Sequence, residues 1–297
     1  MFKKLLVANY FAFFVLSTSF AGGESDSTTP TMSDYDLYGT YTLSIGQLDW
    51  NKNSSSASRE PMLYQPFSIE GWVGKKLTQD TEGILSTKLT FYKRTGNILE
   101  PEDDAIKKAL TLNLTHLRHY DSSTSFINLG YIYSDEIENN SSNVDANSFI
   151  LSTGLATESM ILEFGIGSTN TEILSYYVDE IVYYNFSYKL PISDRMNLIA
   201  AKHYTEYERK LDSNPDGDGE DMDISGLKVT YDLKNSFITF GGDRYTVKNG
   251  ASPENTGGSF YFSWTVPIGK SANNRTSFIL DNRPAIDKVI GFGAALN

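Results

Sequence analysis

The chain has 297 residues, with 37 acidic side chains against 25 basic ones, three histidines and no cysteine. The net charge of −12 argues against a nucleic-acid partner, because phosphate recognition needs clustered Lys and Arg. The lack of cysteine excludes disulfides, Cys-ligated zinc, thiol catalysis and a lipid-modified cysteine at the N-terminus.

The first 21 residues have the pattern of a cleaved secretion signal. Lys3 and Lys4 supply positive charge, an apolar run follows from Leu5 to Leu16, and Ser19-Phe20-Ala21 provides small residues at a cleavage site. A membrane-anchoring helix is the alternative, but the run is shorter than the ~20 residues that such a helix needs. Residues 22–34 are rich in Ser, Thr, Gly and Asp and are predicted to be a flexible mature N-terminus.

From Leu37 onward, apolar and polar residues alternate with a period of two, which is typical of strands and not of helices. Twelve segments show the pattern: Leu37–Trp50, Phe67–Val73, Ile84–Tyr92, Ala109–Tyr120, Ser125–Tyr133, Ser148–Thr157, Met160–Gly167, Glu180–Leu190, Met196–Tyr207, Ile224–Leu233, Ser236–Lys248 and Ser259–Ile268. A weaker pair, Thr276–Leu280 and Lys288–Leu296, would raise the number of strands to fourteen.

The links between these segments alternate between short and long. Short links fall at 75–83, 121–124, 158–159, 191–195, 234–235 and 269–275, and longer polar links at 51–64, 94–104, 134–147, 168–179, 208–223 and 249–258. A membrane barrel has short periplasmic turns and long extracellular loops, whereas a secreted β-sandwich, the alternative fold, has no reason to alternate in this way. Residues 35–297 are therefore predicted to form one all-β domain, a transmembrane antiparallel up-and-down barrel of 12 strands, or 14 if the last pair belongs to it.

In these features the chain resembles the outer-membrane β-barrels of Gram-negative bacteria, in the size class of twelve to fourteen strands. The final stretch, VIGFGAALN, is similar to the last strand that barrel assembly machinery recognises, although it ends on Asn297 and its last aromatic residue is Phe292. The resemblance implies location in the outer membrane and contact with its lipids, with lipopolysaccharide and with the assembly machinery.

The segment Asp212–Asp223 has six acidic residues and no basic one. Asp212, Asn214 and Asp216 match positions 1, 3 and 5 of a twelve-residue calcium loop, with Asp218, Glu220 and Asp223 at positions 7, 9 and 12. The segment is thus a candidate Ca²⁺ site, and the alternative is a solvated acidic loop. No other cofactor is expected.

Several charged residues fall on the polar side of their strands, namely Glu70, Lys88, Glu163 and Lys228, while Lys202 fits this side less well. In a barrel the polar side faces the lumen, because a charge on the lipid face costs about 2–4 kcal/mol near the middle of the membrane. These residues are the candidate lumen-facing groups. Their mixed signs are compatible with a narrow polar pore or with a filled interior.

No catalytic motif is present, and the three histidines, His116, His119 and His203, do not form a pattern typical of an outer-membrane hydrolase. We therefore expect no enzymatic activity. The predicted function is passive, porin-like passage of small solutes. The alternative is a non-conducting surface barrel with a structural, adhesin or autotransporter-like role.

Overall fold

The computed structural model describes residues 37–51, 62–94, 106–137, 144–171, 176–211, 214–249, 255–269 and 274–282. The predicted signal peptide and flexible N-terminus, residues 1–21 and 22–34, lie outside the described residues, as does the predicted strand Lys288–Leu296.

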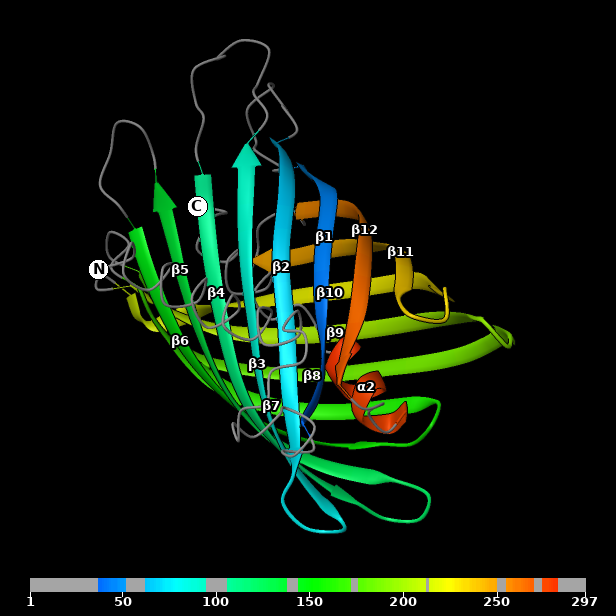
Figure 1. The fold of residues 1–297 in the computed structure, drawn as a ribbon. Coiled ribbons are helices and arrows are strands. Elements are labelled where there is room, and N and C mark those ends of the chain that lie inside the picture. The colour runs from blue at the N-terminus through cyan, green and yellow to red at the C-terminus, as the bar shows by residue number, and fades with distance from the viewer. Residues whose placement is uncertain are drawn as a thin grey trace, which may run out of the picture.

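Twelve antiparallel strands form one closed barrel, in which each strand pairs with its neighbours in the chain and β1 pairs with β12 (Figure 1). The strands are β1 (Leu37–Asn51), β2 (Met62–Lys76), β3 (Thr81–Arg94), β4 (Ile106–His119), β5 (Thr124–Ile137), β6 (Val144–Ala156), β7 (Met160–Thr171), β8 (Tyr176–Ser193), β9 (Met196–Leu211), β10 (Asn214–Asp232), β11 (Phe237–Asn249) and β12 (Asn255–Gly269).

This topology confirms the prediction of a 12-stranded up-and-down barrel, and the β-sandwich alternative is wrong. The contact between β1 and β12 runs from Tyr38 opposite Gly269 to Asn51 opposite Thr256, so the ring closes along the full length of both strands. A closed ring leaves no strand edge with unpaired backbone groups, which is the condition for a sheet to lie in lipid.

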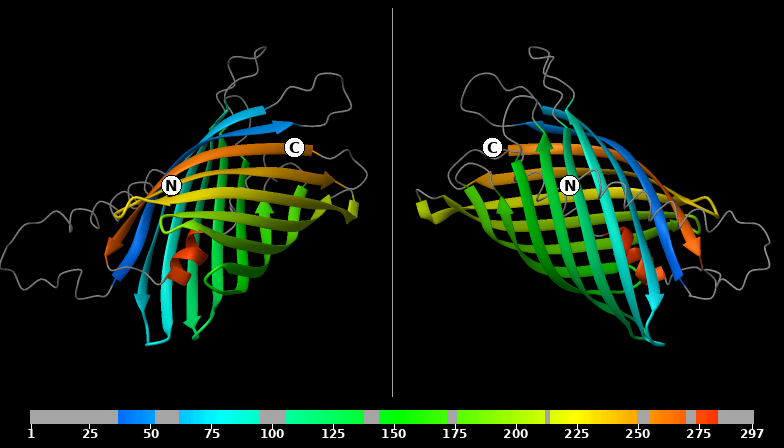
Figure 2. Two further views of the ribbon diagram at one scale, coloured as in Figure 1. Left: turned by 90° about the vertical axis from the view of Figure 1, so that its right-hand side faces the viewer. Right: turned by 60° about the vertical axis from the view of Figure 1, so that its left-hand side comes forward.

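The alternative of fourteen strands predicts a thirteenth strand at Thr276–Leu280, and this prediction is wrong. Residues of the segment Thr276–Leu280 form part of a helix, α2 (Asn274–Asp281), which lies inside the ring of strands (Figure 2). Because β12 has already paired with β1, no edge remains for a thirteenth strand, and the apolar residues of this segment are buried against the inner wall instead. Within the described residues, no helix is long and apolar enough to cross a membrane.

The two faces of the sheet differ in chemistry, as the period-two pattern predicts. The outer face exposes large apolar side chains on almost every strand, including Ile45, Phe67, Leu85, Leu114, Leu129, Phe149, Leu151, Phe164, Phe186, Leu227, Phe240, Phe260 and Trp264. The inner face carries many hydroxyl side chains, including Thr40, Thr42, Ser68, Thr115, Ser152 and Ser263. An apolar belt around a polar interior is the surface that a lipid-embedded barrel needs.

Tight turns join the strands at one end of the barrel, here called the turn end. The Leu77 N–H donates to the Thr81 carbonyl at 2.9 Å, and the Tyr120 N–H donates to the Ser123 carbonyl at 2.9 Å. In the turn between β10 and β11, Lys234 adopts a left-handed backbone with φ of 79°, and its N–H donates to Asp232 Oδ1 at 2.6 Å. Of the links predicted to be long, 51–64 and 94–104 fall largely outside the described residues, whereas 134–147, 168–179 and 208–223 consist mostly of paired strand residues.

Candidate functional site: the barrel lumen and helix α2

The lumen contains a cavity of about 870 Å³. Its lining includes residues of the turn end, such as Asp194, Arg195 and Lys234, and residues nearer the opposite ends of the strands, such as Pro66 and Tyr245. Side chains of α2 also line it. The cavity therefore extends along the barrel and passes beside the helix.

Among the described residues, ten charged side chains line the cavity, five basic and five acidic. They are Lys88, Lys189, Arg195, Lys228, Lys234, Glu70, Asp194, Asp232, Asp243 and Asp281. Because the two signs balance, the lining carries no net charge to concentrate ions of one sign.

Apolar residues of α2 attach it to the wall of the lumen. Phe278 and Ile279 are buried in a cluster with inward-facing residues of eight strands, Tyr38, Trp72, Ile84, Leu117, Phe126, Ala156, Ile161 and Ile199. Lys189 on β8 lies over the Phe278 ring at 4.6 Å from its centre. The helix thus belongs to one apolar cluster with the wall and narrows the lumen at the turn end.

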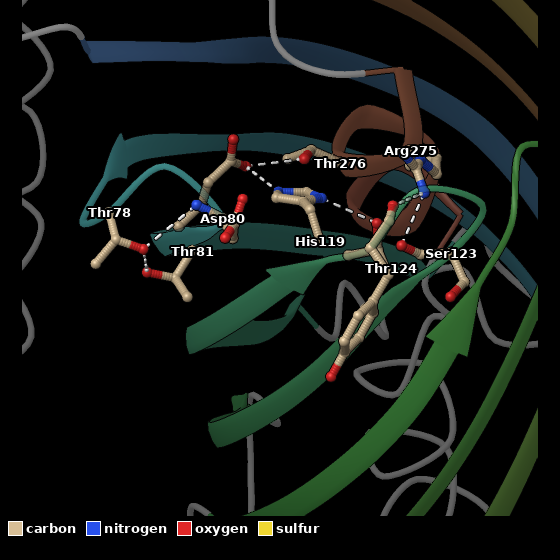
Figure 3. A network of polar contacts seen from close by, with 10 residues as sticks. Thr78, Asp80, Thr81, His119, Ser123, Thr124, Arg275 and Thr276 are labelled. Carbon is tan, nitrogen blue, oxygen red and sulfur yellow. Dashed lines mark hydrogen bonds and ion pairs between the residues drawn. The ribbon is translucent and has the colours of Figure 1, made fainter.

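Polar contacts fix the first turn of α2 (Figure 3). The Arg275 guanidinium donates to the carbonyls of Tyr120 and Ser123 at 2.9 and 2.7 Å, so it holds the turn between β4 and β5. The Thr276 hydroxyl donates to Glu82 Oε2 at 2.9 Å, and His119 Nε2 lies 3.2 Å from the same oxygen. One buried carboxylate therefore joins α2 to strands β3 and β4.

The last residue of α2, Asp281, contacts the wall at strands β2 and β10. The Trp72 indole N–H donates to Asp281 Oδ1 at 3.2 Å, and Lys228 Nζ donates to the Asp281 carbonyl at 2.7 Å. The Asp281 side chain is exposed to the cavity, although it lies inside the ring of strands. This enclosure raises the pKa of the Asp281 carboxyl to about 6, against the opposing effects of Trp72 and Lys228, while Glu70 raises the pKa further.

The four residues predicted to face the lumen all lie on the inner face, but in two settings. Glu70, Lys88 and Lys228 line the cavity, and Lys88 Nζ lies 3.7 Å from Glu70 Oε2. Glu163 is buried on the inner wall, where its Oε1 accepts hydrogen bonds from Ser152 and Tyr183 at 2.7 and 2.9 Å. The structure does not bring these four residues together into one cluster.

Lys202 lies on the outer face. Its side chain is 52% exposed, and its register partner on β8 is the exposed Phe186. Lys202 Nζ forms an ion pair with Asp223 on β10 and donates to Ser225 Oγ at 3.1 Å. A pair of opposite charges thus interrupts the apolar surface, which accounts for the poor fit of Lys202 to the polar side of its strand.

The acidic segment predicted to bind calcium is largely part of a strand. β9 continues to Leu211 and β10 begins at Asn214, so most of the link predicted at 208–223 is paired backbone, with an irregular register between Asn214 and Asp218. Asp212 lies outside the described residues, Asn214, Asp216, Asp218 and Glu220 lie on β10, and Asp223 pairs with Lys202.

An extended strand does not fold around an ion as a twelve-residue loop does. Across the described part of the chain, no group of three or more His, Cys, Asp or Glu residues could hold a metal ion. Calcium binding by this segment stays a prediction, which a calcium titration of the unfolding temperature would test.

The histidines lie in three separate places. His116 is exposed on the outer face, whereas His119 is held at the turn end by Glu82 and by Thr124, whose Oγ1 lies 2.9 Å from His119 Nδ1. His203 is buried on the inner face of β9, with its Nε2 2.7 Å from Thr205 Oγ1.

Sequence reasoning missed helix α2 and its anchors. The segment Asn274–Asp281 contains three adjacent apolar residues, Phe278, Ile279 and Leu280. Similar runs occur inside the strands, as at Phe149–Leu151, so the residue pattern alone does not distinguish the helix.

No family model and no curated protein sequence matches the chain. Among solved structures, an outer-membrane channel from Pseudomonas putida F1 has 11% sequence identity and a TM-score of 0.51, covering 82% of this chain and 100% of that one. The translocator domain of the autotransporter NalP from Neisseria meningitidis has 8% identity and a TM-score of 0.46, covering 89% and 97%. The β domain of the Bordetella autotransporter BrkA has 10% identity and a TM-score of 0.41, covering 78% and 99%.

At such identities the likeness shows the fold, and the fold is that of the outer-membrane β-barrels, as the sequence predicts.

Proposed function

We propose that the protein is a non-enzymatic outer-membrane channel for small polar solutes, in which α2 narrows the periplasmic end. The apolar belt supports a place in the membrane. The observation that carries the proposal is the cavity, which runs past α2 to Asp194, Arg195 and Lys234 at the turn end. A polar space that reaches this end among the described residues supports an open path over a filled interior.

The cavity wall carries basic and acidic residues in equal number, which supports a general pore and not an ion-selective one. With five basic and five acidic residues on the cavity wall, neither cations nor anions are concentrated by a net field. We therefore expect the permeability ratio of K⁺ to Cl⁻, from the reversal potential in a KCl gradient, to lie within about a factor of three of one.

A second candidate function is the non-conducting surface barrel. The observation that favours it is the apolar cluster that joins Phe278 and Ile279 of α2 to residues of eight strands and restricts the lumen at one end. Full burial of one Phe or Ile side chain is worth about 1.5–3 kcal/mol, and fixing the helix costs conformational entropy, so the net free energy that holds α2 is small. A helix held by a small net free energy constricts the pore without closing it permanently.

Single-channel conductance with substituted cysteines tests the proposal. The natural chain has no cysteine, so each introduced thiol is the only reactive one. Ser277 lines the cavity on α2, whereas Phe240 is 62% exposed on the outer face. We expect wild-type protein to give conductance steps, and a positively charged methanethiosulfonate reagent to reduce them in Ser277→Cys but not in Phe240→Cys.

The two candidate functions predict different results. A bilayer that stays silent with correctly folded wild-type protein would favour the non-conducting barrel. Steps that the reagent leaves unchanged in Ser277→Cys would place the conducting path away from α2 and contradict the proposed route. Heat-modifiable mobility on gels serves as the check that each variant is folded.

A further inference from the structure

A row of buried polar side chains crosses the inner wall on β7, β8 and β9. Glu163 on β7 is the register partner of Asn185 on β8, and Asn185 is the register partner of His203 on β9. All three side chains are at most 4% exposed. Side chains of register partners on one face of a sheet are close neighbours, so the row brings carboxylate, amide and imidazole together.

Glu163 is held in place by neighbouring hydroxyls. Its Oε1 accepts from Ser152 Oγ at 2.7 Å and from the Tyr183 hydroxyl at 2.9 Å. Gly165 makes this possible, because a Cβ at that position would lie 2.1 Å from the Tyr183 ring. Both hydrogen bonds use the same oxygen, and the other carboxylate oxygen, Oε2, has no partner.

The neighbours of Glu163 also have unsatisfied atoms. Both amide atoms of Asn185, Ser187 Oγ and His203 Nδ1 are buried without hydrogen-bond partners. When His203 Nε2–H donates to Thr205 Oγ1, Nδ1 is an acceptor. Each buried polar group without a partner costs about 1–3 kcal/mol, so several in one place are an energetic defect unless something else binds there.

The charge of Glu163 is unbalanced as well. Within the described residues it forms no ion pair, unlike Glu70, which lies beside Lys88 in the same lumen. A buried carboxylate is stabilised by a cation that also donates hydrogen bonds. The acceptor atoms of Glu163, Asn185, Ser187 and His203 could receive hydrogen bonds from the N–H groups of such a cation.

We propose that Glu163, Asn185 and His203 form a binding site for a small organic cation with N–H donors, of the primary ammonium class. Asn185 and His203 line the lumen cavity, and Glu163 lies next to Asn185, so a solute in the lumen meets the row at Asn185 and His203. The N–H groups of the ammonium donate to the Glu163 carboxylate, the Asn185 carbonyl oxygen and His203 Nδ1. The inference rests on the proposed function for the entry of the solute and deepens it, since it names a class of solute.

Methylammonium and tetramethylammonium chloride are matched probes for this site. Both ions carry one positive charge, but only methylammonium has N–H donors. We would measure the unfolding temperature of the purified full-length protein in detergent against the concentration of each salt. We expect methylammonium to raise the unfolding temperature with saturation, and tetramethylammonium to give only the effect of ionic strength.

Two variants locate the site. Glu163→Gln has nearly the same shape and keeps the acceptor for Ser152 and Tyr183, but loses the charge. We expect it to weaken the apparent affinity for methylammonium at least about tenfold, as the loss of a charge-assisted hydrogen bond implies. Glu70→Gln removes a lumen carboxylate that already has a cationic partner, and we expect its affinity to equal that of wild type.

Two results would overturn the inference: equal stabilisation of wild type by the two salts, or full affinity in Glu163→Gln. If Glu163→Gln does not fold, the comparison of the two salts on wild type still decides. Because this measurement needs no transport, a protein that binds methylammonium but shows no conductance would contradict the proposed function and leave the site standing.

Discussion

Thr276 donates its hydroxyl hydrogen to Glu82 Oε2 at 2.9 Å, and both side chains are almost completely buried. This bond joins the first turn of α2 to strand β3, where Glu82 also meets His119. The constriction of the lumen therefore depends on one carboxylate as well as on apolar packing.

Replacement of Glu82 by Ala is expected to loosen α2. Thr276 and His119 both lose their partner, at a cost of about 1–3 kcal/mol for each buried group left unsatisfied. Hydrogen exchange of the α2 amides should become about tenfold faster or more, while exchange in the strands stays unchanged. Asp80→Ala, in the neighbouring turn and exposed, is the control. Unchanged exchange in Glu82→Ala would show that apolar packing alone holds the helix.

Truncation of Phe278 to Ala is expected to widen the path beside α2. Phe278 is 4% exposed, and its ring contacts Lys189 and the apolar cluster. Loss of a buried phenyl ring costs about 3–5 kcal/mol where the site does not collapse, which is enough to release the helix. Single-channel conductance should increase.

Leu190→Ala, on the outer face and 48% exposed, is the matched control for Phe278→Ala and should conduct as wild type does. Equal conductance of Phe278→Ala and wild type would mean that α2 does not limit the current.

The docking of α2 is expected to weaken as the pH rises through about 6. Asp281 has a pKa of about 6 in the folded protein against an ordinary value of 3.8, so the folded state binds its proton more tightly than an undocked helix does. The stabilisation that follows is complete below pH 4 and is lost as the pH rises through 6. Exchange of the α2 amides, corrected for intrinsic rates, should show greater protection at pH 5 than at pH 7.5.

Asp281→Asn separates this effect from the titration of other groups near α2. The groups that face Asp281 are Trp72, Lys228 and Glu70, and His119 contacts the same helix through Glu82. In Asp281→Asn, the protection of the α2 amides from hydrogen exchange should change much less between pH 5 and pH 7.5 than it does in wild type. A variant with the pH dependence of wild type would show that Asp281 is not the group responsible.

Each strand of a barrel wall has one face toward lipid and one face toward the lumen. The fold could be predicted because the alternation of apolar and polar residues reflects these two environments. Segments such as Ile84–Tyr92 and Ser148–Thr157 place leucine or phenylalanine outward and hydroxyl side chains inward. The order of residues along these segments is therefore enough to predict their strands. The strand ends were less predictable. β10 continues to Asn214 through Asp- and Gly-rich sequence, because pairing with β9 outweighs the low strand propensity of these residues.

The candidate site was only partly predictable. Alternation places Glu70, Lys88, Glu163 and Lys228 on the inner face, but it does not tell which of them has a partner. The register partners Glu163, Asn185 and His203 are separated by 22 and 18 residues, and only the pairing of three strands brings them together. Helix α2 was misread as a strand, because its position depends on a lumen that the other strands create.

The ion pair between Lys202 and Asp223 is expected to stabilise the barrel through coupling of the two charges on the outer face. Either charge alone would face the apolar surface near Phe186 and Leu227, where an unpaired Lys costs about 2–4 kcal/mol near the middle of the membrane and an unpaired Asp costs less. Lys202→Met and Asp223→Leu should each destabilise the protein, whereas the double variant should lose much less than the sum. The coupling free energy, measured by denaturant unfolding in detergent or lipid vesicles, should be about 2 kcal/mol.

The pair of Glu70 and Lys88 provides the comparison, because its charges lie 3.7 Å apart in the lumen and face water. A solvated pair of this kind contributes about 0–1 kcal/mol, so Glu70→Gln and Lys88→Met should be nearly additive. Equal coupling in the two pairs would show that water reaches Lys202 and Asp223 as freely as it reaches the lumen. The outer face of β9 and β10 would then lie beside lipid headgroups or solvent and not within the apolar belt.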